Sequence, residues 1–89
     1  MNQKYEFTFL LNQEEELKSI KSLIASLEGK IEKEENWGKK TLSFTIKKNT
    51  AANYYDWIIE MKKSNMKEFK KKLNFNEKII RYLILSIDL

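Results

Sequence analysis

The chain has 89 residues, of which 42% are hydrophobic and 34% charged, so it can form one small domain with a hydrophobic core and a charged, solvent-exposed surface. It contains no cysteine and no histidine, which excludes disulfides, zinc fingers, thiol nucleophiles and histidine-based catalysis. No run of about 18 apolar residues occurs and no signal-peptide core precedes the first predicted strand, so we expect neither a membrane span nor a secretory leader. The formal net charge of +4 modestly favours polyanionic partners.

The first third of the chain predicts a strand followed by a helix. Residues 5–11 place Tyr, Phe, Phe and Leu at every second position, which is the period of a β-strand. Asn12 and Glu15 have the spacing of a capping box, and apolar residues then recur at helical spacing, so we expect a helix over residues 13–28. Gly29 stands where a left-handed cap would end this helix.

A long second strand is predicted over residues 30–48, with a bend at Gly38. A glycine inside an extended run marks a bulge or bend, because it adopts backbone angles that a Cβ forbids. From residue 42 to residue 46 every second residue is apolar, as in a strand with one buried and one solvent-exposed face: Leu42, Phe44 and Ile46. The bend would project Lys39 and Lys40 from the sheet.

The second half of the chain predicts a turn, a strand, a helix and a last strand. Residues 49–53 are small and polar, which is typical of a turn, and the aromatic and β-branched residues 54–61 predict a strand paired with the second one. Asn65 and Glu68 repeat the capping-box spacing and predict the start of a second helix. Residues 79–87 form a final apolar strand.

The element order β-α-β-β-α-β predicts one α+β domain over residues 1–89. It is the order of the ferredoxin-like sandwich, in which two helices pack on one face of a four-stranded antiparallel sheet. Alternate residues of a strand point to opposite faces of the sheet. One alternating set, the core phase, is expected to face the helices: Tyr5, Phe7, Phe9, Leu11, Tyr55, Trp57, Ile59 and Met61. The other set is expected to form the open sheet face: Glu6, Thr8, Leu10, Tyr54, Asp56, Ile58, Glu60, Arg81, Leu83 and Leu85.

The open face is predicted to be apolar enough to meet a partner. Its candidate partner-binding residues stand among charged side chains: Leu10, Tyr54, Ile58 and Leu83. Apolar patches of this kind often form protein interfaces, although scattered apolar residues are also normal on a protein surface. Trp57 belongs to the alternating set that faces the core. For Trp37, at the bend, the sequence allows either packing in the core or stacking on a base.

Two functions hosted by the same fold are disfavoured by the residues. An RNA-recognition motif stacks bases on aromatic side chains of its central strands, but Thr8 and Asp56 occupy those positions and Tyr54 is the one ring on the open face. An acyl-phosphate hydrolase needs a glycine-rich anion loop and an arginine after the first strand, and residues 11–13 offer neither. Runs of glutamate such as residues 14–16 do not converge on a site and indicate solvated charge.

The segment Trp-Gly-Lys-Lys-x-Leu at residues 37–42 resembles bacterial ribosomal protein six of the small subunit. The opening Tyr-Glu at residues 5–6 is similar to that family's first strand. Residues 75–81, Phe-Asn-Glu-x-Ile-Ile-Arg, resemble its turn into the last strand. The resemblance covers nearly the whole chain, with matched element order.

The resemblance implies the same sandwich fold, no catalysis and no cofactor. It implies a structural protein of the small ribosomal subunit, in the cytoplasm or in an organelle. The protein would bind the central domain of small-subunit ribosomal RNA together with small-subunit ribosomal protein eighteen. We expect Lys39 and Lys40 at the bend, and then Lys4 and Arg81 beside the outer strands, to contact RNA phosphates. The alternative is a small regulatory or homodimerising domain that does not bind RNA and self-associates through the open face.

Overall fold

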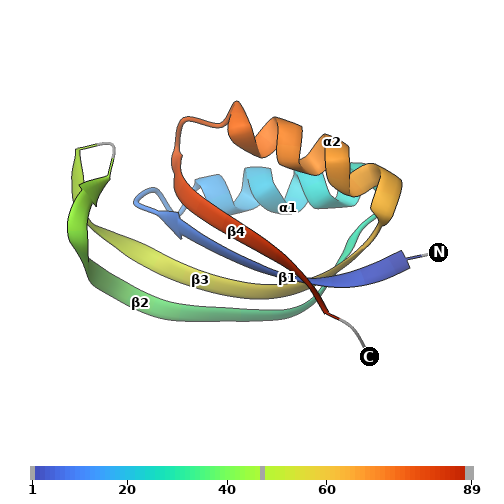
Figure 1. Cartoon of the computed structure of the whole chain (residues 1–89), viewed down its shortest axis with the longest axis horizontal. Helices are drawn as coiled ribbons and strands as arrows, with labels where there is room; N and C mark the ends of the chain where they lie inside the picture. Colours follow the sequence, from blue (N-terminus) through green and yellow to red (C-terminus); the bar gives the residue numbers. More distant parts are fainter. Residues whose placement is uncertain (1, 47, 88–89) are drawn as a thin grey trace.

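The computed structural model describes residues 2–46 and 48–87 as an α+β sandwich, which confirms the predicted ferredoxin-like fold. Its elements are β1 (Asn2–Leu11), α1 (Glu16–Ser26), β2 (Lys30–Ile46), β3 (Asn49–Lys62), α2 (Lys63–Asn74) and β4 (Ile79–Ile87). The four strands form one antiparallel sheet in the order β2-β3-β1-β4, and both helices cover the same face (Figure 1). The alternation predicted at Phe44 and Ile46 concerns side chains outside the described part of the chain.

The core lies between the helices and one face of the sheet. In the β1–β3 register Phe7 is opposite Trp57 and Phe9 is opposite Tyr55. The Phe9 ring meets Trp57 edge-to-face at 4.9 Å between centroids and stacks on Tyr55 at 5.1 Å. Every residue predicted for the core phase is buried: Tyr5, Phe7, Phe9, Leu11, Tyr55, Trp57, Ile59 and Met61. The assignment of Trp57 to the core is therefore confirmed.

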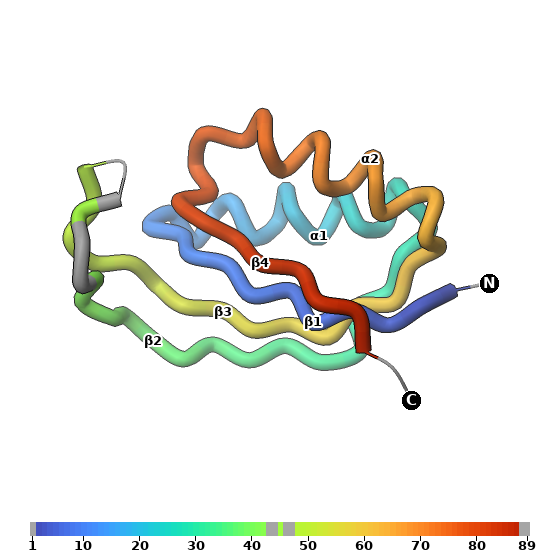
Figure 2. The backbone as a smooth tube through the Cα atoms, viewed as in Figure 1, coloured from blue at the N-terminus to red at the C-terminus, as the bar shows by residue number. Residues whose placement is uncertain are grey.

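Strand β2 bends at Gly38, as predicted. Gly38 has a φ of +80°, and the β2–β3 register shifts between Asn36 and Gly38, so Trp37 is the extra residue of a bulge. The Asn36 side-chain oxygen accepts a 2.8 Å hydrogen bond from the Gly38 N–H and holds the bend. Beyond it, residues 39–46 of β2 and 48–53 of β3 form an arm. The part of the arm that Figure 2 draws in colour turns away from the line of the sheet.

The turn predicted over residues 49–53 is wrong. These residues form the first part of β3, where Asn49 pairs with Ile46 and Asn53 pairs with Lys39. The chain has already reversed at Lys48, whose φ is +66°. Small polar residues predict a turn from composition, but here they form one strand of a largely exposed arm.

The capping box predicted for α1 does not form. The helix begins at Glu16, and the preceding Glu15 makes no side-chain cap hydrogen bond. The amide of Asn12 instead donates a hydrogen bond to the side-chain oxygen of Asn49. Asn12 thus ties the β1–α1 loop to the arm.

The capping box predicted for α2 does not form either. The helix begins at Lys63, so Asn65 lies inside its first turn. The Asn65 amide donates a 2.8 Å hydrogen bond to the carbonyl oxygen of Leu27, beyond the end of α1. A tertiary hydrogen bond between the two helical segments has replaced the predicted local one.

Gly29 is required for space and not for a left-handed cap. The left-handed residue at the end of α1 is Glu28, with a φ of +60°. The Gly29 N–H donates a 2.9 Å hydrogen bond to the Ile24 carbonyl oxygen, and a Cβ on Gly29 would lie 2.9 Å from both the Ile24 and Met61 side chains. The missing side chain lets the end of α1 pack closely on β3.

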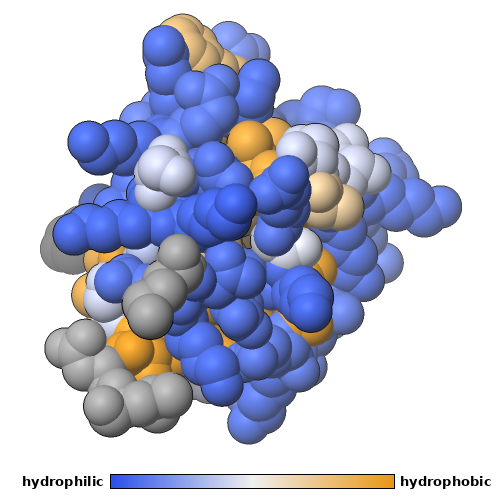
Figure 3. All heavy atoms as spheres, turned by 90° about the vertical axis from the view of Figure 1, so that its right-hand side faces the viewer, coloured by the Kyte–Doolittle hydropathy of each residue, from blue (hydrophilic) through white to orange (hydrophobic). Residues whose placement is uncertain are grey.

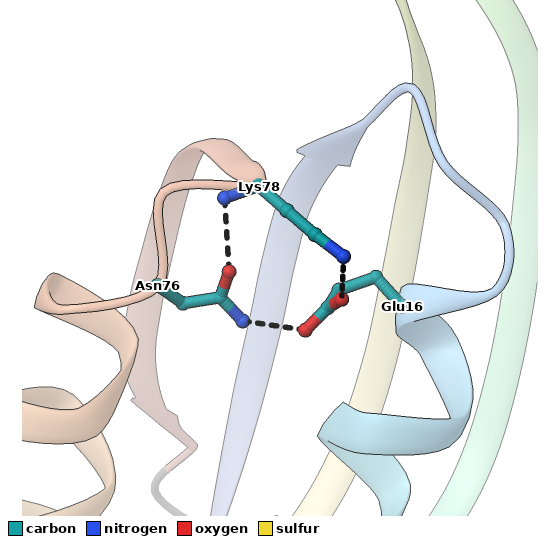
Figure 4. Close-up of polar contacts among 3 residues, drawn as sticks. All are labelled: Glu16, Asn76 and Lys78. Atoms are coloured by element: carbon teal, nitrogen blue, oxygen red, sulfur yellow. Dashed lines mark hydrogen bonds and ion pairs between the residues drawn. The ribbon is translucent and has the colours of Figure 1, made fainter.

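The turn between α2 and β4 is fixed to the start of α1 by polar contacts (Figure 4). The Asn76 amide donates a 2.8 Å hydrogen bond to Glu16, and its side-chain oxygen accepts a 2.9 Å hydrogen bond from the Lys78 N–H. The Lys78 ammonium lies 3.6 Å from the other Glu16 carboxylate oxygen. These contacts give a structural reason for Asn76 in the segment that leads into the last strand.

We predict that Gly29→Ala lowers the free energy of unfolding by about 1–3 kcal/mol, because the added methyl group overpacks the contact with Ile24 and Met61. Gly38→Ala has open space around the new Cβ, so its cost of about 1–2 kcal/mol comes from the left-handed backbone alone. Urea unfolding measures both values. Gly38→Asn should recover part of the Gly38→Ala loss, whereas a stable Gly29→Ala variant would contradict the packing argument.

Candidate binding surfaces

The open sheet face contains a shallow apolar hollow that brings together three predicted partner-binding residues. Leu10, Tyr54 and Leu83 line this hollow of about 170 Å³, together with Thr8 and Arg81. Leu83 is 56% exposed, so it offers a large apolar contact area to a partner. Three neighbouring strands supply these side chains, because Leu10 lies opposite Tyr54 on one side and Arg81 on the other.

Leu10 is less exposed than the sequence suggested. Only 8% of its surface is accessible, because it forms a small second core with Ala52 and Ile80. Leu42 and Tyr54 pack against this cluster, so residues of the arm cover part of the open face. The expectation of an exposed Leu10 is therefore wrong: Leu10 is a buried residue that lines the hollow.

Trp37 adds a second aromatic ring to the open face, which the sequence reasoning missed. Its ring stacks on Tyr54 with centroids 5.0 Å apart and planes 8° from parallel, and half of the residue stays exposed. The indole N–H donates a 2.8 Å hydrogen bond to Glu35. The sequence located the bend at Gly38, but it gave no signal for which face the bulged tryptophan would join.

Ile58 lies away from the hollow, about 13 Å from Tyr54 along β3 at the usual rise of a strand. It is half-buried and sits opposite Glu6 on β1 and Lys33 on β2. Leu85 is opposite Glu6 on the other side and is half exposed. The apolar surface therefore extends across the sheet in two parts.

Carboxylates lie among these apolar side chains: Asp56 stands between Tyr54 and Ile58 along β3, and Glu6 stands between Ile58 and Leu85 across the strands. Asp56 is opposite Thr8 and Glu35, and the Thr8 hydroxyl donates a 3.4 Å hydrogen bond to it. A hydrogen bond with Asp56, and then the negative charge of Asp56, raise the pKa of Glu6. The Lys33 ammonium, 2.8 Å from Glu35, and the Trp37 N–H lower the pKa of Glu35. The centre of the open face is negative, which suits a basic partner and disfavours phosphates.

Lys39 and Lys40 are both exposed, as predicted, but they lie on opposite faces of the arm. Lys39 pairs with Asn53 and Lys40 pairs with Ala52, and neighbouring residues of a strand point to opposite sides. Neither lysine makes an ion pair within residues 2–46 and 48–87. They cannot act as one paired site, although both remain free to contact phosphates.

Lys39 lines a polar hollow of about 350 Å³ between the arm and the β1–α1 loop. A second lysine, amide groups and one hydroxyl line the rest of it: Lys48, Asn12, Asn49, Asn53 and Thr50. Cations with amide donors and acceptors suit a phosphate backbone beside an unpaired nucleotide. The sequence reasoning missed this hollow because it treated residues 49–53 as a turn.

Lys4 and Arg81 do not join the arm lysines in one site. Lys4 forms a 3.3 Å ion pair with Glu32, which reduces its value as a free cation. Arg81 is exposed at the rim of the apolar hollow. The two lie near opposite ends of β1, about 20 Å apart at the rise of a strand, because Arg81 is opposite Leu10.

Within residues 2–46 and 48–87, no group of three or more acidic side chains is placed to hold a metal ion. No helix in this part of the chain is long and apolar enough to cross a membrane.

The ribosomal protein S6 family model matches residues 4–86 of this chain. The small ribosomal subunit protein bS6 of Bartonella bacilliformis is 34% identical over 94% of this chain and 67% of its own length. The bS6 protein of Buchnera aphidicola is 36% identical over 92% of this chain and 69% of its own. That of Agrobacterium fabrum is 31% identical over 94% of this chain and 60% of its own. The chain thus spans about two thirds of the length of these relatives.

Solved structures also resemble the fold. The 30S ribosomal protein S6 of Thermotoga maritima superposes with a TM-score of 0.85 at 24% identity, over 98% of this chain and 89% of that one. An uncharacterised protein of the same organism gives a TM-score of 0.62 at 11% identity, over 99% of this chain and all of that one. At these identities both likenesses show the fold alone.

We predict that Glu6→Gln stabilises the protein at neutral pH. Because the pKa of Glu6 is raised in the folded state, stability falls as pH rises through that pKa, and the amide removes this loss. Water screens the exposed pair, so the gain is on the order of 0.5 kcal/mol. Urea unfolding against pH should show the gain vanish in acid, where wild-type Glu6 is protonated. Glu77→Gln is the exposed control, and a loss of stability in Glu6→Gln at neutral pH would contradict the repulsion.

Proposed function

The chain belongs to the ribosomal protein S6 family, whose named relatives are structural proteins of the small ribosomal subunit, and from this premise we propose two binding roles. The open sheet face docks a basic protein, which we take to be small-subunit ribosomal protein eighteen. The arm binds the central domain of small-subunit ribosomal RNA. The complex would act in the ribosome of the cytoplasm, as a structural component and not as an enzyme. The observation that carries the proposal is the separation of charge: carboxylates lie on the sheet face and exposed lysines lie on the arm.

The open face fits a partner that is both basic and apolar. Trp37, Leu83 and Leu85 are each at least half exposed, and they flank the strip of carboxylates that contains Glu6 and Asp56. An apolar surface with a charged centre gains affinity from burial and orientation from charge complementarity. A basic segment lying across the strip would relieve the repulsion that raises the pKa of Glu6.

RNA fits the arm better than the sheet face. Lys39, Lys40 and Lys48 are exposed on the arm, and the carboxylate strip lies on the sheet beyond the bend. Phosphate contacts by such lysines release counterions and depend on salt. Because a net charge of +4 over the whole surface is a weak anchor, we expect firm RNA binding only in the partner-bound complex.

Self-association through the same face is the less favoured candidate. Two copies related by a two-fold axis would present the same patch to each other. Pairing this face with itself would bring two carboxylate strips into one interface, where like charges in contact oppose binding. A basic partner meets no such repulsion.

We predict that Ile58→Asp weakens binding of ribosomal protein eighteen by at least about tenfold, because a carboxylate replaces apolar contact area. Glu6→Gln should also weaken binding, although it stabilises the fold. Isothermal titration calorimetry measures both affinities. Phe75→Asp is the matched control, since Phe75 is 77% exposed in the α2–β4 turn, away from the sheet face. Equal affinities for Ile58→Asp and Phe75→Asp would disprove the docking face.

For the arm, we predict that the wild-type protein co-sediments with the small subunit in a sucrose gradient and stays bound to it during a moderate salt wash. Lys39→Glu and Lys40→Glu, made singly because the two side chains lie on opposite faces, should each be released at lower salt than wild type. Lys18→Glu is the control, an exposed and unpaired lysine of α1 in the described chain. Wild-type protein found only at the top of the gradient would disprove the ribosomal role.

A further inference from the structure

A second basic surface lies on the helix side of the molecule, away from the open sheet face. A hollow of about 480 Å³ forms where α2 passes the first residues of β1 and the last residues of β4. We call it the α2 groove, and its lining is Gln3, Tyr5, Lys63, Met66, Lys67, Lys70 and Ser86. Figure 3 views the end of the molecule where α2 begins, and hydrophilic side chains cover most of it.

The three lysines of the α2 groove share one face of the helix. Lys63, Lys67 and Lys70 are separated by four and three residues, the spacing that places side chains on the same side of an α-helix. They span about 10 Å along the axis at the helical rise. The sequence does not reveal this arrangement, because Lys70 stands there in a run of three consecutive lysines.

These lysines are also free of ion pairs within the described residues. Their neighbours are not: the Lys72 ammonium lies 3.8 Å from Glu68, and the Lys62 ammonium lies 3.4 Å from Glu28. Three cations without an ion pair in the described part of the chain lie around one hollow, and each attracts counterions. A polyanion can replace those counterions with a gain in entropy.

Residues of β1 and β4 line the groove with neutral hydrogen-bond donors. The Tyr5 hydroxyl donates a 3.0 Å hydrogen bond to the Gln3 side-chain oxygen, which leaves the Gln3 amide nitrogen as a donor. Burial raises the pKa of Tyr5, so its phenol stays neutral. Ser86 adds a hydroxyl from β4, and Met66 is buried beneath the lysines.

We propose that the α2 groove binds the phosphodiester backbone of an RNA strand, which deepens the RNA binding proposed above and rests on it. Lysines act as separate point charges and lack the bidentate fork of arginine, so a row of them suits several successive phosphates better than one small anion. A membrane surface fits less well, because the groove lining includes no exposed large apolar residue that could insert into lipid.

The position of the groove lets RNA and the partner protein bind together. The helices cover one face of the sheet, and the partner surface is the other face (Figure 1). RNA held in the α2 groove would therefore leave Trp37, Ile58 and Leu83 accessible. A chain with cations at the arm and on α2 can contact two separate RNA segments while a protein occupies the sheet.

The test compares two double variants with equal charge change. Lys67→Glu with Lys70→Glu alters the groove. Lys18→Glu with Lys71→Glu alters exposed lysines that do not line it and that make no ion pair within the described residues. Each pair brings the formal net charge of +4 to zero. The protein, in complex with ribosomal protein eighteen, is titrated with a fluorescein-labelled duplex RNA over a salt series. The groove variant should lose about tenfold in affinity at low salt, and its log–log salt slope should fall by about two.

Equal losses in the two double variants would overturn the proposal, because only total charge would then matter. Unchanged RNA affinity with lost binding to phosphatidylserine vesicles would also overturn it, in favour of a membrane surface. Circular dichroism checks that both variants fold. Partner affinity, measured on the same proteins, separates this proposal from the docking of ribosomal protein eighteen, since the groove variant should bind that partner like wild type.

Discussion

The pairing of β1 with β3 is the constraint on which the rest of this structure depends. Its register sets Phe7 against Trp57 and Phe9 against Tyr55, so the largest rings meet under the helices. Because side chains alternate along a strand, the same register sends the residues between them to the other face. A slip by one residue would bury carboxylates and expose the core, and the aromatic packing prevents it.

The bulge at Gly38 gives the open face its particular shape. Trp37, the extra residue, stacks on Tyr54, which packs against the small second core. The same irregularity sets the direction of the arm and the sides on which Lys39 and Lys40 lie. One glycine therefore links the apolar partner surface to the cationic arm, and a change at Gly38 would alter both.

Charge is distributed by face, which net charge alone does not reveal. The centre of the sheet face is acidic, whereas exposed lysines lie on the arm and line the α2 groove. This distribution suits a protein that holds a basic partner on one side and RNA on others. Many of the remaining lysines pair with glutamates across the surface and contribute little to binding.

The sequence by itself determined the element order, the core phase and the bend, because period-two alternation and a lone glycine are local signals. It did not determine the helix starts or the arm, since Asn12 and Asn65 form tertiary hydrogen bonds instead of caps. Only the tertiary structure decided which side chains come together: Trp37 stacks on Tyr54, and lysines of α2 line one hollow with Gln3. Such contacts join residues far apart in the chain, and their geometry depends on how bulges and helices pack, which no local pattern encodes.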